Sequence, residues 1–152
     1  MYAIILAAHN VLRWVVLALA IVTLVRAYAG WLGNGEWTPS DRKVGVFFAS
    51  SIDTQLLLGL LLYFFLSPVT RAAFQDFGAA MASEELRFFV LEHALYMVLA
   101  VVFAHLGTIL PRRVDDAQAK HRRAAIWFSL AVLAILIGMP WMRPLLPGLG
   151  GI

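Results

Sequence analysis

The sequence predicts an all-α membrane protein, a bundle of four transmembrane helices that forms one domain over residues 1–152. Of these residues, 62% are hydrophobic and only 14% are charged, too few to solvate a soluble domain of this size. The chain also holds four apolar runs long enough to cross a bilayer, at about residues 3–28, 44–66, 86–110 and 118–139. These runs leave no room for a separate soluble catalytic domain.

Capping residues mark the ends of the first two connections. Thr38, Pro39 and Asp41 supply a cap, a first-turn proline and an acid near the positive end of a helix dipole, so the second helix starts there. Ser67 and Pro68 end it. A short interfacial helix is expected at about residues 68–78, where Phe74 and Phe77 stand among small and polar residues.

The remaining two helices are delimited in the same way. Ser83, followed by two glutamates, caps the third helix, and Pro111 with two arginines closes it. Asp115 and Asp116 open the fourth helix, which Gly138 and Pro140 end.

Basic residues predict the orientation in the membrane. Eight Lys and Arg residues lie at the ends that hold the 1–2 and 3–4 connections, against three at the opposite ends. The first group is Arg26, Arg42, Lys43, Arg112, Arg113, Lys120, Arg122 and Arg123, and the second is Arg71, Arg87 and Arg143. By the positive-inside rule the connections are cytoplasmic, and both termini lie on the outer, periplasmic side.

Two histidines in separate helices are the strongest candidates for a functional site. At a rise of ~1.5 Å per residue, His9 lies about 9 Å from the outer end of its helix, and His93 and Gly59 about 10 Å from theirs. Two neutral imidazoles at one depth are what a b-type haem requires, and a glycine lets a flat macrocycle approach the backbone. The alternatives are two buried histidines that hydrogen-bond across helices, and close helix packing at Gly59.

Further polar residues in the spans complete the predicted site. Arg13 lies one turn from His9 and is expected either to neutralise a haem propionate or to form an ion pair with Asp53, which lies at a similar depth. Gln55 shares a helical stripe with Gly59, and Tyr96 lies on the helix of His93. Gln55 and Tyr96 therefore join the predicted cofactor-binding residues.

A second pair, His105 and His121, suggests another haem near the inner ends of helices three and four. Two observations weigh against it. His105 is rotated ~120° from His93 around the helix, and His121 stands in a basic run where a surface role is common. A metal or proton-relay site of His9, Asp53, Glu92 and His93 is less favoured, because no Glu-x-x-His pair is present. The absence of cysteine excludes covalent haem attachment and iron–sulfur clusters.

Several motifs together resemble a family of small four-helix bacterial membrane proteins described as cytochrome b-like. They are His9 to Trp14 (HNVLRW), Asp53 to Tyr63 (DTQLLLGLLLY), Arg87 to His93 (RFFVLEH), Lys120-His121 and Pro140-Trp141. This resemblance covers nearly the whole chain and implies haem b, electron transfer, and His9 and His93 as ligands.

The leading functional prediction is a b-type cytochrome-like subunit of the bacterial inner membrane. It holds one haem b between helices one and three and takes part in quinol-linked electron transfer as a redox subunit, with quinone as a further cofactor. The alternative is a non-catalytic accessory subunit of a respiratory or photosynthetic membrane complex. Expected partners are the lipid bilayer, quinol, and other membrane subunits or further copies of the chain; no basic patch for nucleic acid is evident.

The orientation is testable with a reporter that is active only in the periplasm. We expect activity when it is fused after Gly151 and none when it is inserted near Gly35, because the basic connections stay in the cytoplasm. Activity at Gly35 would overturn the predicted topology.

Overall fold

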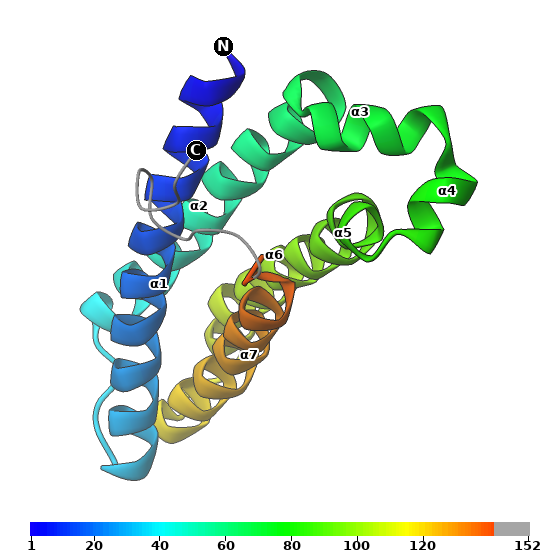
Figure 1. The fold of residues 1–152 in the computed structure, drawn as a ribbon. Helices are drawn as coiled ribbons and strands as arrows, with labels where there is room; N and C mark the ends of the chain where they lie inside the picture. The colour runs from blue at the N-terminus through cyan, green and yellow to red at the C-terminus, as the bar shows by residue number, and fades with distance from the viewer. Residues whose placement is uncertain (142–152) are drawn as a thin grey trace.

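The computed structural model describes residues 1–141, and all regular structure in this range is helical. Four long helices form the bundle: α1 (Tyr2–Leu32), α2 (Pro39–Leu61), α6 (His93–Ile109) and α7 (Ala117–Gly138). Each packs against two neighbours: α1 contacts α2 and α7, and α6, on the other side, contacts the same two helices (Figure 1). Arg143 and Gly151, used in the topology prediction, lie outside the described residues.

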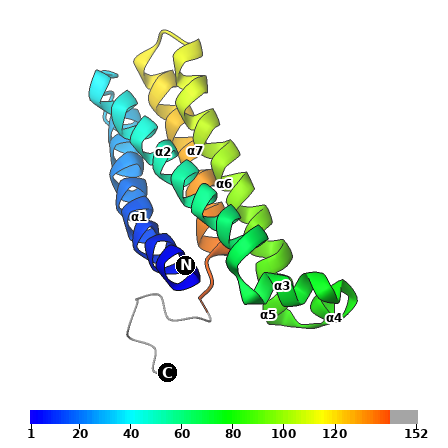
Figure 2. The same cartoon turned by 90° about the horizontal axis from the view of Figure 1, so that it is seen from above.

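The prediction of four apolar helices is confirmed. The helices long and apolar enough to cross a membrane are Tyr2–Leu32, Pro39–Leu66, Glu84–Arg113 and Ala117–Gly138. Two of them, Tyr2–Leu32 and Glu84–Arg113, extend beyond both predicted bounds, because helical hydrogen bonding continues past the apolar run until a cap or a proline stops it. Figure 2 shows the start of α1 at the same end of the bundle as three short helices, α3 (Pro68–Gln75), α4 (Phe77–Ala82) and α5 (Glu84–Arg87). We call this the α3–α5 end, and the opposite one the loop end.

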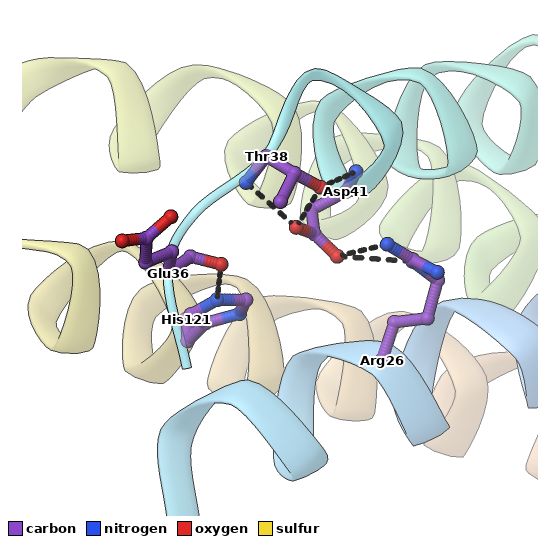
Figure 3. A network of polar contacts seen from close by, with 5 residues as sticks. All are labelled: Arg26, Glu36, Thr38, Asp41 and His121. Atoms are coloured by element: carbon purple, nitrogen blue, oxygen red, sulfur yellow. Dashed lines mark hydrogen bonds and ion pairs between the residues drawn. The ribbon is translucent and has the colours of Figure 1, made fainter. Parts of the chain in front are cut away.

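The predicted start signal of the second helix is a complete capping box. The Thr38 hydroxyl accepts a hydrogen bond from the Asp41 backbone N–H, while the Thr38 N–H donates to Asp41 Oδ2 at 2.8 Å. Arg26 of α1 also forms an ion pair with Asp41 Oδ1 at 2.8 Å (Figure 3). The cap therefore ties α1 to α2 at the loop end.

The predicted single interfacial helix at 68–78 is wrong in its extent. The structure has α3 (Pro68–Gln75) and a separate α4 (Phe77–Ala82). The chain breaks at Asp76, because this side chain accepts a hydrogen bond from Ala79 N–H at 2.9 Å and starts a new helix. Both helices project sideways from the bundle, and Phe74 and Phe77 are exposed (Figure 2).

Two π-helical segments sit where α3 to α5 join the bundle. The segment η1 (Leu62–Leu66) continues α2, and η2 (Phe88–Glu92) connects α5 (Glu84–Arg87) to α6. The two are joined by the Tyr63 hydroxyl, which donates to the Val90 carbonyl at 2.7 Å. A further 3₁₀ turn, η3 (Leu110–Arg113), ends α6 at the loop end. No sequence pattern predicted the π segments.

The core is built largely from small residues. Among its most buried members are six alanines on α6 and α7: Ala100, Ala104, Ala124, Ala125, Ala131 and Ala134. Their size lets the helix backbones approach closely. The buried rings of Phe48 and Phe128 also contact each other, with centroids 5.7 Å apart. Phe128 fits between two glycines, Gly45 of α2 and Gly107 of α6.

This fit gives the first structural prediction. In Gly107→Ala the new Cβ would lie 2.6 Å from a ring carbon of Phe128, so the core is overpacked. We expect a net loss of about 1 kcal/mol of stability, because a clash of ~1–3 kcal/mol exceeds the gain in helix propensity. Thermal unfolding of the purified protein in detergent measures it. The control is Gly78→Ala in α4, whose Cβ meets nothing nearer than 3.5 Å and which should be neutral or stabilising; equal effects would contradict the packing role of Gly107.

Candidate functional site

His9 of α1 and His93, the first residue of α6, face each other within the bundle toward the α3–α5 end. Their ring centroids are 6.5 Å apart, and the ring planes meet at 71°. Gly59 of α2 is the third member: a Cβ built on it would lie 3.4 Å from His9 Cε1. The structure thus brings together the three residues that the sequence placed at one depth.

Two adjoining cavities lie along this histidine pair. The larger has a volume of about 360 Å³ and the smaller about 200 Å³. Both are lined by His9, Ile52, Gln55, Gly59, Tyr63, His93 and Met97. The larger also reaches Arg13, Asn10 and the end of α7 at Met139. The arrangement is a mainly apolar space with two imidazoles and one guanidinium in its walls.

A carbonyl at the end of α7 fixes the His93 ring. Nδ1 of His93 lies 2.7 Å from the carbonyl oxygen of Gly138, the last residue of that helix. Such a carbonyl has no partner within its own helix, so it accepts the imidazole N–H. With the proton on Nδ1, Nε2 of His93 is left as the nitrogen that can bind a metal or accept a hydrogen bond.

His9 is held through its backbone rather than through its ring. The Gln55 amide donates to the His9 carbonyl at 3.0 Å, which links α2 to α1 at the site. The Nδ1 atom of His9 is buried and has no hydrogen-bond partner among the described residues. A buried ring nitrogen of this kind is costly unless something else satisfies it.

The other predicted site residues fall into two groups. Arg13 is buried in the wall of the larger cavity, with its guanidinium 5.8 Å from the ring centroid of Trp14, and Gln55 lies in the wall of both cavities. Tyr96 lines neither cavity and instead packs against Gly138. Tyr96 lies at the depth of the cavities but points to a different side of α6, and depth alone does not give that direction.

Asp53 has a different partner from the one predicted. The sequence suggested Arg13, but the Asp53 carboxylate bonds to His105 Nε2 on α6, with Oδ1 and Nε2 3.0 Å apart. The depth estimate used for the pair cannot tell which neighbouring helix a side chain faces. In the structure Arg13 turns to the cavity, whereas Asp53 turns to α6.

His105 and His121, the second-site candidates, serve separate contacts. The expectation that His121 lies in a surface turn is wrong, since the residue is only 2% exposed. Its Nε2 lies 3.2 Å from the Glu36 carbonyl oxygen (Figure 3). Its ring packs edge-on against Trp37 and occupies space that the missing side chain of Gly30 leaves open. His121 thus fastens the α1–α2 connection to α7.

The four-residue metal or proton-relay site is also not assembled. Glu92 forms an ion pair with Arg87 at 2.8 Å, and Asp53 bonds to His105. Within residues 1–141, no three His, Asp or Glu side chains are grouped so as to hold a metal ion.

Known proteins add nothing to this geometry: no family model matches the chain, and no similar curated protein or solved structure was found. The resemblance to cytochrome b-like proteins stays a prediction.

Sequence reasoning missed two contributors to the site, Met97 and Gly138. The spacing of Gln55, Gly59 and Tyr63 at i, i+4 and i+8 predicts one helical stripe, but Tyr63 was not among the predicted cofactor-binding residues. Met97 also lines both cavities, but a methionine in an apolar helix carries no distinctive signal. Gly138 acts through its carbonyl, which no side-chain pattern can reveal.

Tyr63 offers a test of how the site is held. We expect Tyr63→Phe to lose about 1 kcal/mol of stability, because the Val90 carbonyl then loses its donor in an apolar setting. Thermal unfolding in detergent measures the loss. Tyr2→Phe is the matched control, since Tyr2 lines the same cavity and forms no hydrogen bond to the described residues. An equal loss of stability in Tyr2→Phe would show that the hydrogen bond from Tyr63 to Val90 does not stabilise the contact between η1 and η2.

Proposed function

We propose that this protein is a b-type cytochrome-like subunit of the bacterial inner membrane, which binds haem b between α1 and α6 and takes part in quinol-linked electron transfer. His9 and His93 would hold the haem iron. The observation that carries the proposal is the placement of the two imidazoles 6.5 Å apart beside a cavity of about 360 Å³.

The residues present fit this group. Two imidazoles that share one metal ion through bonds of about 2 Å would have ring centres up to roughly 6 Å apart. The observed spacing is 6.5 Å. In addition, the Gly138 carbonyl orients His93 through Nδ1, which is the usual support of a metal-binding histidine.

When bound, a haem whose iron is held by both His9 and His93 would supply one-electron transfer rather than oxygen chemistry. The chain's own residues supply the surroundings. Ile52 and Met97 keep the walls apolar, Gly59 leaves space beside His9, and the Arg13 guanidinium favours a negatively charged group in the larger cavity.

The quinol part of the proposal rests on the smaller cavity. Its remaining walls are apolar side chains of α2, η1 and α6, including Leu60, Phe64 and Val98. A space of this character suits an apolar head group better than a charged metabolite. In the proposed topology both cavities lie in the outer half of the membrane.

The test is the absorption spectrum of the protein purified from its native membrane. We expect a Soret band and a dithionite-reduced α band of low-spin haem b. His9→Ala and His93→Ala should each abolish both bands, since either change removes an axial ligand. Added imidazole should restore them in His93→Gly by replacing the missing ring.

His105→Ala is the matched control, because His105 lies on α6 and lines neither cavity. It should keep both bands. His121→Ala is a poorer control, since it opens a hole in the buried contact with Trp37. A folded wild-type protein without haem absorbance, even with its native partners present, would overturn the proposal and favour the accessory subunit.

A further inference from the structure

The Asp53–His105 pair lies on the outside of the bundle. It joins α2 to α6, with Asp53 Oδ1 and His105 Nε2 3.0 Å apart, and the two side chains are 40% and 46% exposed. Figure 2 shows α2 and α6 as neighbouring helices along one side of the molecule. Neither cavity described above is lined by these two residues.

The pair also lies deep in the apolar part of the chain. Asp53 follows Lys43 by a rise of about 15 Å, and His105 precedes Arg112 by about 10 Å. The hydrocarbon core of a bilayer is ~30 Å thick, so both side chains lie far from either headgroup layer. An ionisable pair at that depth faces the interior of a bundle, a water-filled cavity or another protein, because lipid tails offer it no hydrogen bonds.

The surroundings of the pair suit a protein neighbour. On α2, Ser50 and Thr54 are exposed one turn apart beside Asp53, and on α6 Val102 is exposed beside His105. Small and short side chains at a four-residue spacing allow another helix to approach closely. The hydrogen bond between Asp53 and His105 uses only one oxygen and one ring nitrogen, which leaves Asp53 Oδ2 and His105 Nδ1 for a partner.

We infer that this α2–α6 face, with the Asp53–His105 pair at its centre, is the contact surface for a second copy of this chain. A closed dimer of two copies inserted with the same orientation has its twofold axis along the membrane normal. Such an axis places α2 of one copy opposite α6 of the other. Asp53 of each copy therefore meets His105 of the other, and the two pairs become one ring of alternating carboxylates and imidazoles.

Charge complementarity selects the second copy as the occupant. The face carries one acid and one base side by side on adjacent helices, so it is complementary to itself under the twofold axis. The inference does not depend on what occupies the cavities, because neither Asp53 nor His105 lines them.

Cysteine cross-linking in native membranes tests the contact. The sequence has no cysteine, so each single-cysteine variant reports on one position only. We expect copper phenanthroline to link at least one of Ser50→Cys, Thr54→Cys and Val102→Cys into a dimer of two differently tagged copies. Leu133→Cys on α7 is the control, since it is exposed and, ten residues from Arg123, matches the depth of Asp53. A yield in all three that is no higher than in Leu133→Cys overturns the inference.

Variants that exchange the acid and the imidazole distinguish an Asp53–His105 contact between two copies from the contact within one copy. In the cross-linking background, Asp53→His and His105→Asp should each lower the dimer yield roughly tenfold, because like groups then face each other. Co-expression of the two variants with different tags should restore the mixed dimer, and so should both changes in one chain. Loss of the dimer in the co-expressed pair while each variant still folds, or a wild-type protein that is a monomer in lipid nanodiscs, overturns the inference.

Discussion

In a membrane, polar groups on the four apolar helices would need partners in the protein, a neighbouring protein or a water-filled cavity, because hydrocarbon supplies none. Regular α-helix satisfies most of the backbone, but the two π segments and the end of α7 leave carbonyls to be paired. Side chains take them up: Tyr63 donates to Val90, Thr70 to Tyr63, Arg71 to Phe65, and His93 to Gly138. The candidate site is therefore assembled by the same interactions that close the ends of the helices.

Close packing at the loop end complements this arrangement. Phe128 fills the space left by Gly45 and Gly107, and buried alanines lie on both α6 and α7. Small residues bring these backbones together. Toward the α3–α5 end the larger side chains of Ile52, Tyr63 and Met97 surround a cavity instead. The bundle is thus tightly packed at one end and hollow at the other, where the two histidines lie.

The four histidines show how context assigns roles to one residue type. His9 and His93 face a shared cavity, His105 bonds to an acid on the outer face, and His121 is buried beneath the α1–α2 connection. An imidazole can donate, accept or ligate, and its neighbours determine which of these it does. Only the first pair places two rings close enough to share a ligand.

The sequence by itself determined the four apolar helices, most of their caps, and the common depth of His9, His93 and Gly59, because hydrophobic length, local capping chemistry and rise per residue are properties of consecutive residues. It did not determine direction around the helices. Whether Asp53 faces Arg13 or His105, whether Tyr96 reaches the cavity, and which carbonyl orients His93 depend on how the helices are rotated and packed. The π segments add a residue to a turn and shift that rotation, so only the tertiary structure decided these contacts.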